Sequence, residues 1–144
     1  MIKRILIIDD EDDLREVTQM SLEEMAGWQT LAAPSGAEGL KRAAEELPDV
    51  ILLDVMMPDM GGMEVLARLK RDERTAAIPV VLLTAKVRAA DPGRAAGSAG
   101  VIVKPFDPLQ LAAQIAEILG WPPSTHEAPS GDGGPGSTEP VNPP

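Results

Sequence analysis

The sequence contains no cysteine, and this absence excludes disulfide bonds, thiol chemistry and cysteine-bound zinc or iron–sulfur centres. Basic residues are outnumbered, because 13 Lys and Arg against 23 Asp and Glu give a formal net charge of −10. This charge argues against a non-specific nucleic-acid surface, which needs a basic patch. Long apolar runs are also missing, since none approaches the roughly 18 residues that suggest a membrane-spanning helix.

The amino-terminal residues do not read as a secretion signal. Lys3 and Arg4 precede an apolar run, as in a signal, but the run covers only residues 5–8 and continues directly into acids. The apolar fraction of the whole chain is 44%, which is ordinary for a globular core. The length of 144 residues favours one domain.

Short apolar segments alternate with helical patterns along residues 1–120. Unbroken apolar runs at 5–8, 50–53, 80–83 and 101–103 are typical of strands buried on both faces of a parallel sheet, and 28–31 is a shorter strand. Five strand–helix repeats predict an α/β fold with a doubly wound, five-stranded parallel sheet and helices on both faces. If the strand order is 2-1-3-4-5, the first and third strands flank the point where ligands bind in such sheets.

Each helical pattern has its own apolar positions. These positions are Leu14, Val17 and Met20 before Gly27; Ala37, Leu40, Ala44 and Leu47; Val65, Leu66 and Leu69; and Leu111, Ile115, Ile118 and Leu119. The third helix is expected from 63 to about 74, with Lys70 and Arg71 outward. Residues 86–100 contain Asp-Pro-Gly and two further glycines, so only a short, mobile helix is expected there.

The composition changes after Gly120. Residues 121–144 contain seven prolines, four glycines and three serines, with no Lys or Arg. Such a segment does not bury enough apolar surface to order itself, so 121–144 is expected to be a disordered acidic tail. The folded body is then residues 1–120, and no second domain is expected after it.

Functional side chains follow the buried runs. Asp9 and Asp10 come after the first run, Asp54 ends the third, Thr84 follows the fourth and Lys104 follows the fifth. In open parallel sheets, ligands bind outside the carboxyl ends of the strands. We therefore expect the three carboxylates to share one crevice with a hydroxyl and an ammonium group.

Carboxylates that crowd one crevice repel each other, and a hard divalent cation such as Mg²⁺ removes this repulsion. A carboxylate is also a nucleophile that accepts phosphoryl groups, and a lysine supplies a charge for the phosphate. These parts together predict a phosphoryl-transfer site that works by positioning and charge neutralisation.

Four motifs in register resemble the receiver domain of two-component response regulators, and in particular the single-domain chemotaxis regulators. The matching pieces are Ile8-Asp9-Asp10-Glu11, Leu53-Asp54-Val55-Met56-Met57-Pro58 with Gly62, Leu83-Thr84-Ala85, and Val103-Lys104-Pro105-Phe106. The resemblance implies a flavodoxin-like fold with the strand order given above.

The resemblance also implies roles for single residues. Asp54 is the implied phosphoacceptor, and Asp9, Asp10, Asp54 and the backbone carbonyl of Met56 are the implied Mg²⁺ ligands, with Asp10 more direct than Asp9. Thr84 and Lys104 would bind phosphoryl oxygens. The Lys104–Pro105 bond would be cis, which is accessible only before proline.

The implied function is that of a stand-alone, cytoplasmic regulator and not of an enzyme. A sensor histidine kinase would phosphorylate Asp54, and the signal would leave by protein contacts with an unknown target, without nucleic acid or membrane. The implied output face covers residues 86–119, where Val101 occupies the usual place of an aromatic switch residue. A coupling by the 86–100 segment and Thr84 is therefore expected.

Other readings remain open. The chain could be a phosphorelay intermediate that passes its phosphoryl group to a histidine on another protein. A haloacid-dehalogenase-type phosphohydrolase would need an acid two residues after Asp54, where Met56 stands. A dinucleotide-binding domain would need glycines in place of Asp9 to Asp13. A pseudo-receiver that only binds partners would be favoured by loss of Asp54, of Lys104 or of a residue of the acidic pair, and none of these is lost. His126 lies in the tail and has little support as a phosphohistidine.

Overall fold

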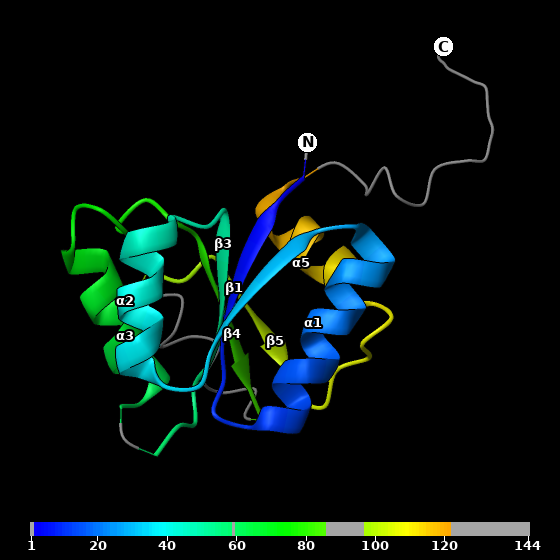
Figure 1. Ribbon diagram of the computed structural model, residues 1–144, viewed down its shortest axis with the longest axis horizontal. Helices are drawn as coiled ribbons and strands as arrows, with labels where there is room; N and C mark the ends of the chain where they lie inside the picture. Colours follow the sequence, from blue (N-terminus) through cyan, green and yellow to red (C-terminus); the bar gives the residue numbers. More distant parts are fainter. Residues whose placement is uncertain (1, 59, 86–96, 122–144) are drawn as a thin grey trace, which may run out of the picture.

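The computed structural model describes residues 2–58, 60–85 and 97–121. Its centre is a parallel sheet of β1 (Arg4–Ile8), β2 (Gln29–Ala33), β3 (Val50–Asp54), β4 (Val80–Thr84) and β5 (Gly100–Val103). The strand order is β2-β1-β3-β4-β5, as predicted (Figure 1). The fold class and strand order expected from the sequence are therefore confirmed.

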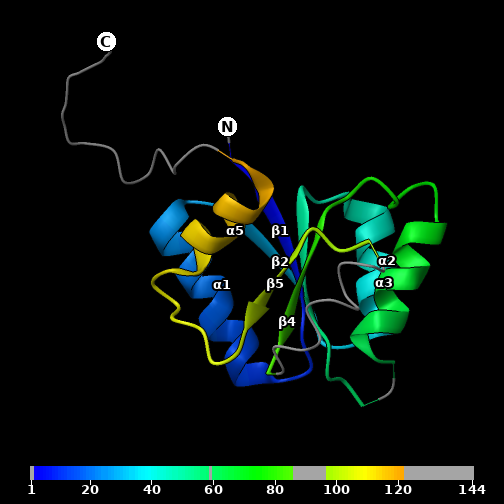
Figure 2. The same ribbon diagram turned by 180° about the vertical axis from the view of Figure 1, so that it is seen from behind.

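Helices cover both faces of the sheet. Helices α1 (Asp12–Ala26) and α5 (Leu111–Leu119) lie on one face, and α2 (Gly36–Glu46) and α3 (Gly62–Arg71) lie on the other (Figures 1 and 2). The short helix expected between strands β4 and β5, and the coupling role expected of it, fall mainly on residues 86–96, outside the described residues. None of the described helices is long and apolar enough to cross a membrane.

Alternate residues of each central strand enter two different cores. Ile5 and Ile7 of β1 pack beneath α1 and α5, whereas Leu6 and Ile8 of the same strand pack beneath α2 and α3. All four are fully buried. This double burial explains why the strand sequences are unbroken apolar runs instead of alternating ones.

The buried face of α1 differs from the predicted one. Val17 and Met20 are 45% and 51% exposed, and the buried positions are Thr18, Leu22 and Ala26. The Thr18 hydroxyl donates a hydrogen bond to the Leu14 carbonyl at 2.7 Å, which satisfies its polar group inside the protein. A search for apolar periodicity misses a threonine that is satisfied in this way.

Helix α2 is also rotated from its predicted face, because glycine lets it approach the sheet. Its buried residues are Gly36, Gly39 and Ala43, and a Cβ added at Gly39 would lie 2.4 Å from the Ile8 side chain. Leu47, predicted to be apolar and inward, is 56% exposed and takes a left-handed conformation (φ 48°) that ends the helix.

Helix α3 is shorter than predicted, since it ends at Arg71 and not near 74. Val65, Leu66 and Leu69 are buried, as expected. Lys70 is not simply outward, because its Nζ donates hydrogen bonds to the Ala76 and Ile78 carbonyls at 3.1 and 3.0 Å. The partial burial of Lys70 lowers its pKa.

Trp121, the first residue of the predicted tail, packs on the folded body. Its ring meets the buried Trp28 ring edge-on with centroids 5.5 Å apart, and the Lys3 ammonium lies 4.5 Å from its ring centre. The Trp121 N–H donates a hydrogen bond to the Ala116 carbonyl at 2.9 Å. Trp121 is therefore part of the body, and residues 122–144 lie outside the described part.

We expect Trp121→Ala to lower the free energy of unfolding by about 1 to 3 kcal/mol, because it removes a half-buried aromatic pair. Urea denaturation followed by circular dichroism measures this change. Leu109→Ala is a matched control, since Leu109 is 63% exposed and its truncation should change stability by less than about 0.5 kcal/mol. Equal stability of wild type and Trp121→Ala would contradict the anchoring role.

Candidate functional site

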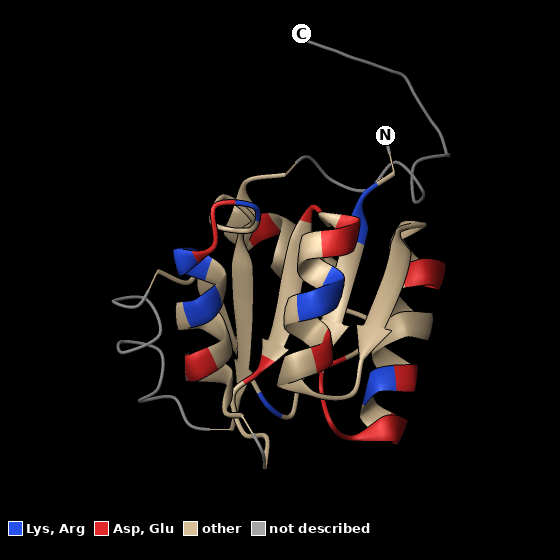
Figure 3. Ribbon diagram, turned by 60° about the vertical axis from the view of Figure 1, so that its left-hand side comes forward, with Lys and Arg blue, Asp and Glu red and all other residues tan. Residues whose placement is uncertain are grey.

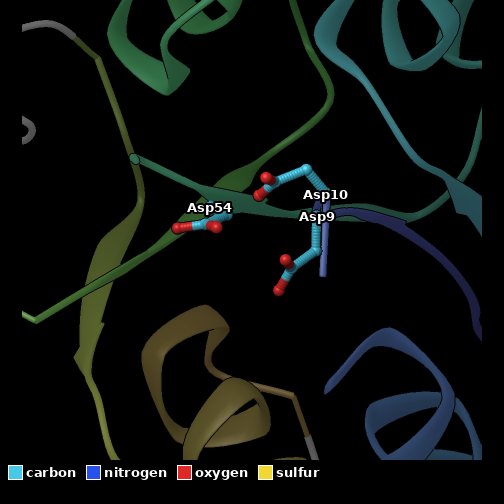
Figure 4. A group of neighbouring side chains, drawn as sticks. All are labelled: Asp9, Asp10 and Asp54. Carbon is cyan, nitrogen blue, oxygen red and sulfur yellow. The ribbon is translucent and has the colours of Figure 1, made fainter. Parts of the chain in front are cut away.

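Three aspartates meet where the two central strands end. Asp9 follows β1 and Asp54 ends β3, and the register of these neighbouring strands pairs Ile8 with Leu53. Asp9, Asp10 and Asp54 each offer a carboxylate oxygen, and these oxygens lie within 4.8 Å of one another (Figure 4). Asp9 and Asp54 are buried and Asp10 is exposed. The predicted acidic crevice is thus formed.

The hydrogen bonds of the buried carboxylates leave acceptor capacity unused. Asp9 Oδ1 accepts from the Glu11 N–H at 2.9 Å, and Asp54 Oδ1 accepts from the Met56 N–H at 3.1 Å. Asp9 Oδ2 is buried and has no hydrogen-bond partner among the described residues. A buried carboxylate oxygen without a partner is costly, so this atom indicates a missing cation or donor.

Lys104 reaches the same crevice from β5. Its Nζ lies 3.3 Å from Asp54 Oδ1 and 3.8 Å from Glu11 Oε1. The sequence pattern predicts no separate role for Glu11, because spacing alone does not say which way a residue at a helix start points. The Lys104–Pro105 peptide bond is cis, as expected.

Thr84 supports the position of Lys104 through its backbone. Its carbonyl accepts the Lys104 N–H at 2.8 Å, and its side chain is buried at the end of β4. The neighbouring residue, Ala85, lines the open cavity of about 230 Å³ over the site. The other lining residues are Asp10, Glu11, Asp54, Met56 and Lys104.

Burial, together with nearby negative charges, raises the pKa of the Asp9 carboxyl to about 6. Burial is the largest cause, and the negative charges of Asp54 and Glu11 act in the same direction. The Glu11 N–H and the Lys104 ammonium oppose the shift. Without a cation, ionisation of Asp9 therefore lowers the free energy of unfolding.

The residues of the crevice fit Mg²⁺. This ion prefers oxygen ligands, keeps several waters and needs only one or two carboxylates. The crevice supplies three carboxylates, one of them with a partnerless buried oxygen, and Met56 on its rim.

Gly62 fixes the loop that follows Asp54. A Cβ added at Gly62 would lie 2.5 Å from the Asp54 carbonyl oxygen and 2.6 Å from Val55 Cα, so only glycine fits without moving the backbone. The Gly62 N–H also donates to the Val55 carbonyl at 2.9 Å. This close approach brings the start of α3 against the end of β3.

Val101, also singled out in the sequence, is not among the residues that line this crevice. Val101 is partly buried against the core beneath α2 and α3. His126 lies outside the described residues.

Comparisons with known proteins agree with this geometry. Residues 5–116 match the family model of the response regulator receiver domain. The phosphate regulon transcriptional regulatory protein PhoB of Pseudomonas aeruginosa is 41% identical over 135 residues, which cover 92% of this chain and 58% of the relative. The DNA-binding dual master transcriptional regulator RpaA of Synechocystis is 41% identical over 118 residues, covering 81% of this chain and 48% of the relative.

Solved structures show the same likeness. A putative response regulator from Chloroflexus aurantiacus is 30% identical with a TM-score of 0.76, covering 83% of this chain and 99% of that one. The chemotaxis protein CheY4 of Vibrio cholerae is 28% identical with a TM-score of 0.76, covering 82% and 99%.

The parallel sheet, with an acidic crevice and a lysine at its carboxyl edge, defines an α/β domain whose charged side chains gather at the strand ends. The chain belongs to the family of response regulator receiver domains. Members of this family are signalling phosphoacceptors, and Mg²⁺ is their typical metal. The chain spans about half the length of the curated relatives it matches.

Metal-free protein should lose stability as the pH rises, because Asp9 has a higher pKa folded, about 6, than unfolded, 3.8. Between pH 3.8 and about 6 the folded state binds more protons than the unfolded state. The contribution of Asp9 to stability is therefore complete below pH 3.8 and is lost as the pH rises through about 6. We expect a loss of about 1 to 2 kcal/mol between about pH 4.5 and 7.

Asp9→Asn should flatten this slope and make the metal-free protein more stable at neutral pH than the wild type. Urea denaturation in chelator across the pH range measures both effects. Asp13→Asn is the control, since Asp13 is exposed at the start of α1. Identical slopes for wild type and Asp9→Asn would refute the assignment of the shift to Asp9.

Gly62→Ala should destabilise the protein by about 2 kcal/mol or more, because the added methyl meets backbone atoms that have no room to move. The adjacent Gly61→Ala is the matched control, since its Cβ would have only the Val55 carbonyl within 4 Å, at 3.8 Å. Thermal unfolding of both variants tests the contrast. Equal effects at the two positions would show that the close approach at Gly62 is not the constraint.

Proposed function

We propose that this chain accepts a phosphoryl group on Asp54 from a histidine kinase and transmits the signal through contacts with another protein. The observation that supports this most directly is the placement of Asp54. Its carboxylate is buried next to Asp9 and Asp10, and Lys104 Nζ lies 3.3 Å from its Oδ1. A nucleophile, a cation site and a fixed positive charge are thus collected in one small cavity.

Asp9, Asp10, Asp54 and the Met56 carbonyl are the proposed ligands of Mg²⁺. When bound, the ion would neutralise negative charge on the carboxylates and on the phosphoryl oxygens. The Asp54 carboxylate oxygen attacks phosphorus, the O–P bond forms and the N–P bond of the phosphohistidine breaks. The electron pair returns to the imidazole nitrogen, which takes a proton and leaves as neutral histidine.

Lys104 and Thr84 are the proposed ligands of the transferred group. The ammonium of Lys104 already faces Asp54, so it supplies positive charge where the phosphoryl oxygens will sit without moving far. The Thr84 hydroxyl at the neighbouring strand end is the proposed second donor. Its backbone holds Lys104 in place through the 2.8 Å hydrogen bond.

The output is proposed to be a protein contact and not direct binding to nucleic acid. The net charge of −10 disfavours DNA binding by these 144 residues. The names of the relatives PhoB and RpaA describe transcriptional regulators, that of RpaA a DNA-binding one, and the name of CheY4 describes a chemotaxis protein. The relatives therefore do not name one downstream partner. The proposed phosphorylation of Asp54 is compatible with the role of a transcriptional regulator and with that of a chemotaxis protein.

We expect a small acyl phosphate with Mg²⁺ to phosphorylate the wild-type protein at one residue, Asp54, as mapped by mass spectrometry after reductive trapping. Asp54→Asn should abolish the modification, because the amide is not a nucleophile. Chelator should also abolish it. Lys104→Ala should slow it by about 100-fold, the usual cost of losing one preorganised charge.

Asp13→Asn is again the control and should be phosphorylated like the wild type. Undiminished labelling of Asp54→Asn, or labelling that is unaffected by chelator, would overturn the proposed function. Stability of each variant is measured in parallel, so that loss of labelling by unfolding is recognised.

A further inference from the structure

A groove of about 480 Å³ lies between α2 and α3. It is formed by the second half of α2 and by the end of α3 with the residues that follow. Both segments lead into the starts of strands, β3 and β4, so the groove lies at the amino edge of the sheet. The acidic crevice lies at the opposite, carboxyl edge. A ligand in the groove would therefore not compete with chemistry at Asp54.

The groove is basic although the protein is acidic. Four of the 13 cations of the chain line it: Lys41, Arg68, Arg71 and Arg74. The acids that line it are Glu45 and Asp72, and the methyl-bearing side chains of Leu40 and Ala44 supply an apolar part. Figure 3 marks the positions of Lys and Arg along both α2 and α3.

Two of the four cations in the groove pair with acids of the same chain, and two do not. Arg68 pairs with Glu64 at 2.7 Å, and Arg74 pairs with Asp72 at 2.8 Å. Within the described part of the chain, Lys41 and Arg71 form no ion pair. Arg71 lies in the last turn of α3, where its positive charge interacts favourably with the helix dipole. Lys41 lies in the middle of α2, where the helix dipole does not stabilise its charge.

The chain beyond Trp121 begins at the same, amino edge of the sheet as the groove, although α5 and the groove lie on opposite faces of the sheet (Figure 1). Trp121 contacts Lys3, and the next residue, Arg4, bonds to the Glu46 side chain at 2.8 Å and to its carbonyl at 2.9 Å. Glu46 is the last residue of α2 and adjoins Glu45 in the groove wall. The 23 residues from 122 to 144 could span up to about 75 Å at about 3.3 Å each, so reach is not limiting.

The composition of residues 122–144 complements the groove. The segment contains Glu127, Asp132 and Glu139 and no Lys or Arg. It also contains seven prolines, which lower the conformational entropy that a segment loses when it docks on an apolar surface.

We propose that residues 122–144 dock in the α2–α3 groove of the same chain, with their carboxylates facing Lys41 and Arg71. Because the segment is tethered at Trp121, its effective concentration at the groove is on the order of millimolar. Contacts too weak to hold a separate acidic peptide are then enough to populate the docked state. Exposed ion pairs are weak and screened by salt, so the docking is salt-sensitive. The proposal does not depend on the function proposed for Asp54.

The absence of cysteine permits a direct test on the full chain, because Ser137→Cys adds a single site for a nitroxide spin label. Amide NMR spectra then report which residues come near the label. We expect the amides of residues 40–45 and 68–75 to lose intensity, whereas those of α1 on the opposite face keep theirs. Raising the salt from about 0.01 M to about 0.5 M should restore the lost intensity, since it shortens the screening length several-fold.

Adjacent residues of α2 give a matched pair of variants. Lys41→Gln should remove most of the intensity loss, and Arg42→Gln, outside the groove lining, should leave it. Replacing Glu127, Asp132 and Glu139 together by their amides should act like Lys41→Gln. These outcomes would support docking by charge in the groove.

Three results would overturn the proposal: no intensity loss at the groove, a loss that Lys41→Gln does not change, or a loss that arises between molecules. The last is detected by mixing spin-labelled chains with isotope-labelled chains that carry no spin label. Broadening in that mixture would assign the groove to a second copy and not to the segment of the same chain.

Discussion

The mutual repulsion of carboxylates buried at the end of two neighbouring strands is the constraint on which the site depends. Asp9 and Asp54 are almost fully buried, Asp10 stands beside them, and their oxygens come within 4.8 Å of one another. Burial and like charge raise the pKa of Asp9 to about 6, so the metal-free fold carries a cost at neutral pH. Lys104 compensates only part of this charge. The same cost is a source of affinity for any group that brings positive charge to the crevice.

Such a site requires a scaffold that does not relax away from it. The central strands are buried on both faces, and the side chains of β1 and β3 enter both cores, which resists displacement of either strand. Gly39 brings α2 onto Ile8, immediately before Asp9, and Gly62 brings α3 onto the backbone of Asp54. A helix therefore packs closely against the backbone next to each of the two repelling carboxylates, Asp9 and Asp54. Interiors packed in this way transmit strain instead of absorbing it.

The two edges of the sheet have different chemistry. The carboxyl edge gathers the acids of the crevice, and the amino edge is held by Lys3, Arg4, Trp28 and Trp121 and adjoins the basic groove. Acids at one edge and unpaired cations at the other keep the two regions chemically separate within one small domain. Residues that leave the body at Trp121 therefore start at the edge away from Asp54.

The sequence predicts the strands of the sheet and the members of the crevice. Unbroken apolar runs require burial on both faces, and parallel strands bring their carboxyl ends to one edge, so Asp9, Asp10, Asp54 and Lys104 are expected at that edge. The strand order that makes them neighbours was implied by the family resemblance. Only the tertiary structure decided which faces of α1 and α2 are buried, because a threonine satisfied by its own helix and glycines in close contact are silent in an apolar pattern. It also decided that Glu11 turns toward Lys104, that Lys70 donates hydrogen bonds to carbonyls of the loop after α3, and that Trp121 joins the body. Each of these depends on where a side chain points or on a partner far away in the chain, and spacing along the sequence contains neither.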